Sequence, residues 1–202
     1  MAQPLTVAVK SALSGRVQHH PQPADSVGGP PNKETQVSNF DPNVPSGFLT
    51  ITGDFTSAVL VKEVPAIGVG NLVLDPTQPF DIQVDWKIDG NIAELWLSAL
   101  AVASPDWIVT AYAESVGPGP EKILVAKNVP VLPLPSANPP FAYSTTLTVP
   151  PGSLDEENPG DPLVSGVYKL VVTVFLDSTF GSPGYDIMGF AEGPVIKVEN
   201  PV

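Results

Sequence analysis

The sequence has no cysteine, two histidines and a single arginine, and each scarcity removes a class of chemistry. Without cysteine the chain forms no disulfide, carries no thiol nucleophile and offers no thiolate to a metal. The two histidines are adjacent, His19 and His20, in a stretch rich in Gln and Pro that is typical of a solvated linker. A Ser-His-Asp triad or a histidine-ligated zinc site in the folded domain is therefore excluded.

Positive charge is also scarce, because nine Lys and Arg residues stand against 21 Asp and Glu residues, for a formal net charge of −12. Nucleic-acid binding needs clustered basic side chains, and the sequence has no such cluster. The sequence has no apolar run long enough to span a bilayer, and residues 1–13 lack the features of a signal peptide. We therefore expect protein partners or self-association, no nucleic acid, no membrane insertion, and a cytoplasmic or particle-associated location.

Proline, in contrast, is abundant, with 25 of 202 residues. Because proline breaks helix interiors and cannot donate to a β-ladder, it belongs in turns, edges and linkers. Residues 92–104 contain neither Pro nor Gly, but their apolar residues lie on both faces of a helix and are equally typical of a buried strand. Helix should be minor, and the composition predicts an all-β fold.

Alternation of apolar and polar residues predicts strands from residue 47 onward. The clearest run is 80–89, where Phe80, Ile82, Val84, Trp86 and Ile88 share one face. Further strands are predicted at 48–52, 58–61, 71–74, 93–102, 107–114, 122–131, 141–149 and 167–176, with a closing hairpin of 187–190 and 195–198 around residues 192–194. This spacing favours a sandwich or barrel over βαβ units.

Two motifs favour the sandwich. Trp86 lies inside the alternating run, and the motif Tyr-x-Leu-x-Val-x-Val begins at Tyr168, shortly after Gly166. Together they resemble the central C and F strands of immunoglobulin-like domains, although the cysteine pair of antibody domains is missing. The resemblance implies an immunoglobulin-like antiparallel β-sandwich in which the Trp fills the core and the Tyr bonds to an upstream turn. A fold of this kind implies no function.

The sequence predicts two parts, an extended Pro-rich N-terminal arm (residues 1–46) and the sandwich (47–202). The arm begins with a strand-like run at residues 5–13, with Leu5, Val7 and Val9 on one face, and continues as a Pro/Gly-rich linker. Because a lone strand is not stable by itself, this run is expected to add to a sheet edge. That edge is either on its own domain or on a neighbour's, and both alternatives stay open.

Aromatic residues that are exposed are candidates for stacking on a carbohydrate or another ligand. They are Trp96, Trp107 and Tyr112. A second packed face or a subunit interface explains them as well.

One acidic loop is a candidate calcium site, since clustered carboxylates are what Ca²⁺ requires. Its residues are Asp155, Glu156, Glu157 and Asp161. The loop does not match the EF-hand pattern, and a solvated loop is the alternative interpretation; calcium is the one cofactor considered.

The function that the sequence favours is that of a structural or interaction protein. The sandwich would be a subunit of a larger assembly, such as a shell, a tail-like particle or a filament, and the arm would mediate contacts between subunits. The alternative is a carbohydrate- or ligand-binding module, calcium-assisted or not. No residue is predicted to be catalytic, so the chain is not expected to be an enzyme.

Overall fold

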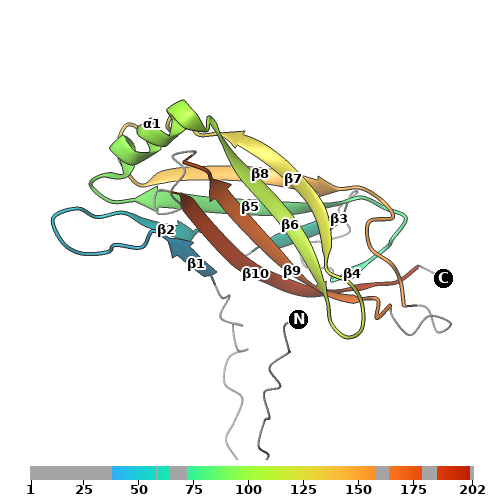
Figure 1. The fold of residues 1–202 in the computed structure, drawn as a ribbon. Helices are drawn as coiled ribbons and strands as arrows, with labels where there is room; N and C mark the ends of the chain where they lie inside the picture. The colour runs from blue at the N-terminus through green and yellow to red at the C-terminus, as the bar shows by residue number, and fades with distance from the viewer. Residues whose placement is uncertain (1–37, 58, 64–71, 158–163, 179–185, 201–202) are drawn as a thin grey trace, which may run out of the picture. The chain divides into compact units, whose positions relative to one another are not determined.

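The computed structural model describes residues 38–57, 59–63, 72–157, 164–178 and 186–200. The chain divides into two units, Met1–Glu34 and Thr35–Val202. The first unit, with the strand-like run at residues 5–13 and both histidines, lies outside the described residues. The second unit is a sandwich of two β-sheets, which confirms the predicted all-β fold (Figure 1).

The larger sheet has the strand order β1-β10-β9-β6-β7. Its neighbours on this path are antiparallel, and β4 pairs parallel with the end of β10. Its strands are β1 (Ser38–Asp41), β4 (Val73–Leu74), β6 (Asp106–Ser115), β7 (Lys122–Pro130), β9 (Val167–Leu176) and β10 (Ile187–Val198).

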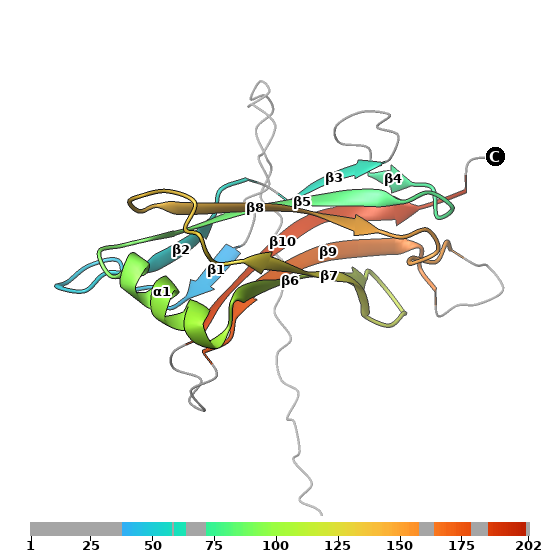
Figure 2. The same ribbon diagram turned by 90° about the horizontal axis from the view of Figure 1, so that it is seen from above.

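The smaller sheet is built around β5 (Phe80–Asp89), which alternates along its whole length as predicted. Strand β8 (Phe141–Val149) pairs with β5 along one edge, while β2 (Thr52–Phe55) and β3 (Leu60–Glu63) share the other edge. Figure 2 shows the two sheets as separate layers, with β5 and β8 in one layer and β6, β7 and β9 in the other.

The centre of the core is an aromatic cluster between the sheets. Trp86 on β5 stacks on Tyr143 of β8 at 5.4 Å between ring centroids and meets Trp107 of β6 edge-on at 5.8 Å. Both indoles are 0% exposed. Trp86 therefore fills the core, as the sequence indicates, but its strand does not lie beside the Tyr168 strand. Trp107 is the tryptophan on the strand that pairs with β9, a difference that sequence alternation alone does not reveal.

Tyr168, near the start of β9, anchors an upstream loop. Its hydroxyl donates to the backbone carbonyl of Asp155 at 3.0 Å, across 13 residues of sequence. This is the tyrosine corner that the likeness to immunoglobulin-like domains implies. Burial of the ring raises the pKa of the Tyr168 hydroxyl, which keeps it neutral and able to donate.

The predicted strand at residues 93–102 is wrong, because this segment forms the helix α1 (Ala93–Ala103). The segment is rich in Ala and Leu, the best helix formers. Ala93, Leu97 and Leu100, spaced at helical intervals, are its buried residues. Apolar residues also lie on the other face of the helix, so the helical spacing of the buried residues could not be recognised in the sequence. No helix in the described parts of the chain is both long and apolar enough to cross a membrane.

Two further boundaries differ from the sequence-based expectation. The predicted closing hairpin is the single strand β10, in which residues 193 and 194 lie in a bulge between Glu192 and Val195. Strand β1, which lies within the predicted arm, pairs with β10. Phe40 of β1 is 9% exposed and contacts Phe55 at 5.1 Å between ring centroids.

Candidate interaction surfaces

The three aromatic residues predicted to stack on a ligand lie in three different environments. Trp107 belongs to the core and offers no face to a ligand. Trp96 lies on α1 and packs, partly buried, against the core. Tyr112 lies on the outer face of the larger sheet, half-buried, and pairs across strands with Ile123 and Val171. The structure therefore does not bring them together as a platform.

Two carboxylates of the acidic loop are engaged by different partners. Asp155 forms an ion pair with Lys122 of β7. Glu156 accepts hydrogen bonds from the backbone and the side-chain amide of Asn200. Glu157 is exposed, and Asp161 lies outside the described residues. Among the described residues, no group of three or more His, Cys, Asp or Glu side chains is placed to hold a metal ion.

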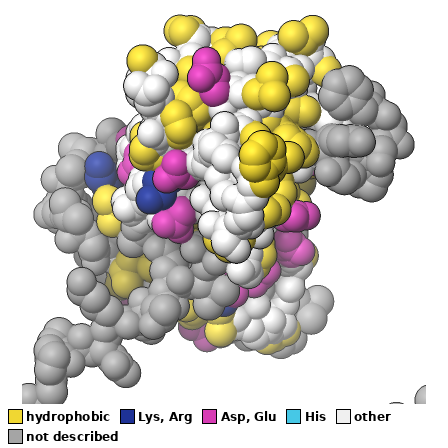
Figure 3. Space-filling view, turned by 90° about the vertical axis from the view of Figure 1, so that its left-hand side faces the viewer, with side chains coloured by type: hydrophobic (Ala, Val, Ile, Leu, Met, Phe, Trp, Pro, Cys, Tyr) yellow, Lys and Arg dark blue, Asp and Glu magenta, His cyan; other side chains and the backbone are white. Residues whose placement is uncertain are grey.

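Exposed hydrophobic side chains gather at one end of the sandwich, where β5 and β7 end and β6 and β8 begin. We call this surface the apolar end. It comprises Phe48 (92% exposed), Val102 (88%), Leu95 (73%), Leu49 (53%), Leu132 (45%) and Val44 (43%). Figure 3 views this side of the molecule and shows hydrophobic side chains covering much of its upper half, with few charged groups among them. So many large apolar groups in water are unusual for an isolated monomer.

The loop that carries Phe48 is held in place by Asn91. The Asn91 side chain accepts a hydrogen bond from the Thr50 amide at 2.7 Å and donates one to the Phe48 carbonyl at 2.8 Å. The backbone N–H of Asn91 donates in turn to the Thr50 hydroxyl at 3.0 Å. Gly90, with φ of 119°, permits this approach, because a Cβ there would lie 2.2 Å from the Thr50 carbonyl oxygen. The exposed Phe48 ring therefore lies on a loop whose backbone is held by hydrogen bonds to Asn91.

Helix α1 adds a second apolar row to the same end. Leu95, Ala99 and Val102 are all exposed and follow the spacing of one helix face. A helix that covers a core normally turns polar residues to water. The opposite, buried face of α1 already accounts for its attachment to the sandwich, so packing of α1 against its own core does not explain this outer row.

The outer face of the larger sheet carries a second apolar surface. Strand pairing places Ile108, Phe175 and Met188 in one row, and Ile123, Tyr112 and Val171 in another. Thr110, Thr173 and Phe190 form the row between them. We call these three rows the apolar sheet face. These positions on β6, β7, β9 and β10 carry no charge, but the rows end in carboxylates: Glu192 of β10 pairs with Val171, and Asp41 of β1 pairs with Met188. Lys169 lies beside the Val171 row and forms an ion pair with Glu192 at 2.8 Å.

The outer face of the smaller sheet is polar. Asp85 accepts hydrogen bonds from Ser57 and Ser144, both at 2.6 Å, and from Gln83 at 2.9 Å. Burial opposes ionisation of Asp85, but these hydrogen bonds outweigh it and lower its pKa. Thr148 donates to Asp81 in the same way. Polar side chains of β5 therefore lie on the outer face of this sheet and hydrogen-bond to side chains of β8 and of the segment after β2.

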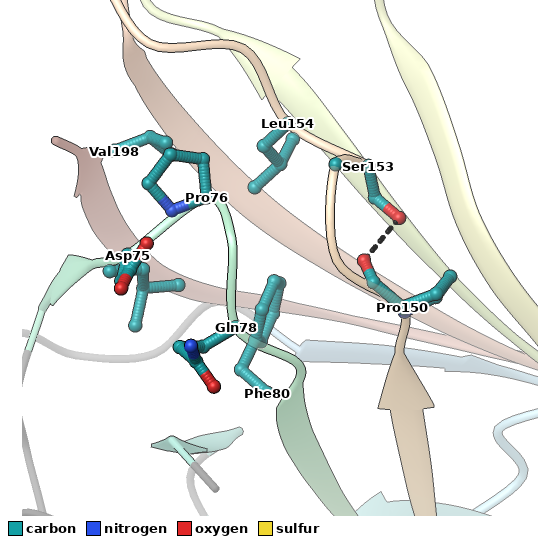
Figure 4. A pocket seen from close by; sticks show the side chains of 10 residues that line it. Asp75, Pro76, Gln78, Phe80, Pro150, Ser153, Leu154 and Val198 are labelled. Carbon is teal, nitrogen blue, oxygen red and sulfur yellow. Dashed lines mark hydrogen bonds between the residues drawn. The ribbon is translucent and has the colours of Figure 1, made fainter. Parts of the chain in front are cut away.

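A small hollow lies at the end opposite α1, beside the turn from β4 to β5 (Figure 4). Its volume of about 10 Å³ is enough for roughly one water molecule. The Asp75 carboxylate at its rim accepts from the backbone and hydroxyl of Thr77. The hollow is too small for a sugar ring.

The open sheet edges on the β7 side carry lysines that discourage further pairing. Lys127 of β7 donates across to the Thr146 carbonyl on β8 at 3.1 Å, which joins the two sheets at this edge. Lys122 is tied to Asp155 at the other end of β7. Lysine and bulges on an edge strand are common protection against unwanted strand addition, and the β6–β7 ladder has a bulge beside Tyr112.

Sequence reasoning found Tyr112 but missed the surfaces described above. The apolar end combines residues from two separate loops, one before β2 and one between β7 and β8, with residues of a helix that was predicted as a strand, so no local sequence pattern predicts it. The apolar outer residues of β9 were a usable signal, because Val171 and Phe175 occupy positions where a half-solvated strand would carry polar groups. No protein-family model matches the chain, and no curated protein matches its sequence.

Proposed function

We propose that this protein is a structural subunit that associates with other copies of itself, and that the apolar end forms a contact between them. The observation that carries the proposal is Phe48, 92% exposed on a loop that Asn91 holds in place. A large aromatic side chain on an ordered scaffold can bury its area at little cost in conformational entropy, which is how interface anchors contribute most of their energy.

The charge of the chain opposes self-association, because copies with a net charge of −12 repel one another. The acidic residues at the apolar end include Glu94 on α1, Asp89 at the end of β5 and Asp106 at the start of β6. Burial of the six exposed apolar side chains between two copies is the contribution that offsets this repulsion. The proposal includes no catalytic step, and no contact among the described residues favours the ligand-binding alternative over it.

The test is the mass of the full chain by light scattering over a range of concentrations, compared with the double variant Phe48→Ser/Val102→Ser. We expect an assembly for the natural chain and a lower mass for the variant, because the variant loses the contact at the apolar end. Val116→Ser is the matched control, because Val116 is 50% exposed after the opposite end of β6. It should leave the mass unchanged. A monomeric natural chain, or a double variant that keeps the natural mass, would contradict the proposal.

A further inference from the structure

The apolar sheet face has no partner among the described residues, and its dimensions indicate what can cover it. Three strand spacings of about 4.8 Å give it a width of about 14 Å from β10 to β7, and the four-residue step from Ile108 to Tyr112 gives about 14 Å along the strands. This area, about 200 Å², is well below the roughly 800 Å² per partner that a stable interface between globular proteins needs. About four residues of extended peptide span the same width.

Residues 5–13 have the composition of such a peptide. Leu5, Val7 and Val9 alternate with smaller or polar residues, so an extended segment turns three apolar side chains to one side. Lying across a sheet face, an extended segment keeps its backbone N–H and C=O groups at its flanks, where water satisfies them. Lys122 and Lys127 on β7, the second bonded to the Thr146 carbonyl of β8, make addition of a further strand less favourable on this side of the sandwich.

Charge complements this fit. Residues 1–24 contain Lys10 and Arg16 and no Asp or Glu, a net charge of +2. Since the whole chain carries −12, the remaining residues carry −14. The margin of the apolar sheet face carries three carboxylates, Asp41, Glu114 and Glu192, against one lysine, Lys169. Lys10 within residues 5–13 and Arg16 just after them therefore favour the approach of this segment to the face.

We propose that the apolar sheet face of one copy binds residues 5–13 of another copy. The inference rests on the proposed self-association and adds a second contact to it. The linker, residues 14–37, joins the segment to β1, an outer strand of this same sheet. A flexible chain of 24 residues has a root-mean-square reach of about 27 Å, which is more than the width of the sheet face and enough to bridge neighbouring copies.

The experiment uses the absence of cysteine. One full-length chain carries Ala8→Cys, on the side of the segment opposite Val7 and Val9, and a second carries Met188→Cys on the apolar sheet face. The mixed chains are treated with a short thiol-reactive cross-linker. The matched control replaces Met188→Cys by Ala142→Cys, an exposed position on the outer face of the smaller sheet.

We expect the two-chain product to form about ten times faster with Met188→Cys than with Ala142→Cys, because docking raises the effective concentration of the two thiols. Adding Val7→Asp to the first chain should remove this excess. Equal rates at the two positions would overturn the inference. So would cross-linking that occurs only within one chain when that chain carries both thiols.

The two proposals fail separately. If the mass depends on Phe48 and Val102 but the excess cross-linking at Met188 is absent, the apolar sheet face does not bind the segment, while the contact at the apolar end stands. If the excess cross-linking persists but the mass does not depend on Phe48 and Val102, copies associate through residues 5–13 and not through the apolar end.

Discussion

Trp107 and Ile108 are neighbours in sequence that occupy opposite environments. The Trp107 indole is 0% exposed and packs against Trp86 and Tyr143 at 5.8 and 5.5 Å between ring centroids, whereas Ile108 is 40% exposed on the outer face of the same strand. Tyr143 completes the cluster by donating from its hydroxyl to the Val131 carbonyl at 3.2 Å, and burial raises its pKa to about 12. The neutral hydroxyl is therefore the form that the core holds.

At this scale we predict that Trp107→Ala lowers the free energy of unfolding by about 3–5 kcal/mol, through lost contacts and the cavity left behind. Ile108→Ala, one position along the same strand, should cost less than about 1 kcal/mol, because its side chain is already partly in water. Denaturant titration of both variants measures the difference. Similar losses for the two would mean that the strand does not alternate between core and surface as described.

At the scale of elements, α1 and the loop before β2 act together. The Trp96 amide donates to the Ile92 carbonyl within the first turn of the helix, and the Ile92 amide donates to the Thr50 carbonyl at 3.3 Å. Asn91 therefore lies at the junction where the loop, the end of β5 and the helix meet. Its side-chain hydrogen bonds fix the position of Phe48 relative to Leu95, and hence the shape of the apolar end.

We predict that Asn91→Ala destabilises the protein by about 1–2 kcal/mol, the net value of one or two lost hydrogen bonds. The local effect should be larger than the global one, because the loop can open while the sheets stay paired. Hydrogen exchange should accelerate at the Thr50 amide and stay unchanged within β9. Asn128→Ala is the control, since the Asn128 side chain makes one long contact, 3.5 Å to Asp106. Unchanged exchange at Thr50 would show that Asn91 does not hold the loop.

The position of β1 also matters for any truncation. Its Phe40 ring lies where a Cβ at Gly53 or Gly189 would come within 2.2 to 2.4 Å of it, so the two glycines make room for the ring between the sheets. A chain shortened to begin at Gly47 would lose Phe40 along with the N-terminal segment. Truncation to remove the segment alone should therefore begin no later than Thr35, where the second unit starts.

At the scale of the whole molecule, association of copies depends on the repulsion between their acidic surfaces and on the apolar surface that they bury. Raising the ionic strength from about 0.01 M to about 0.15 M shortens the screening length from about 30 Å to about 8 Å. We predict that the assembled fraction measured by light scattering rises with this change, because salt weakens the repulsion and leaves apolar contact intact. The excess cross-linking at Met188 should fall, since its basic segment is attracted electrostatically. An assembled fraction that falls with salt would indicate a contact dominated by ion pairs.

The sequence by itself determined the fold class, the central strand β5 and the tyrosine corner. Alternation over 80–89 requires a strand with one buried face, and Tyr168 follows a glycine at the start of a second such strand. These are local signals, since the period of two and the turn residues can be counted along the chain. The absence of cysteine and the scarcity of basic residues depend on composition alone. The expectations that the chain carries out no thiol chemistry and binds no nucleic acid rest on them and not on the arrangement of the strands.

The tertiary structure alone decided the identity of α1, the continuity of β10, the place of β1 and the two apolar surfaces. Residues 93–103 have apolar side chains on both sides, so only packing shows which side the core takes. Gly193 and Pro194 are turn formers, but they form a bulge here because β10 pairs with β9 both before and after them. The apolar end joins Phe48, Leu95 and Leu132, which are far apart in sequence and come together only because the strands between them return to the same end of the sandwich.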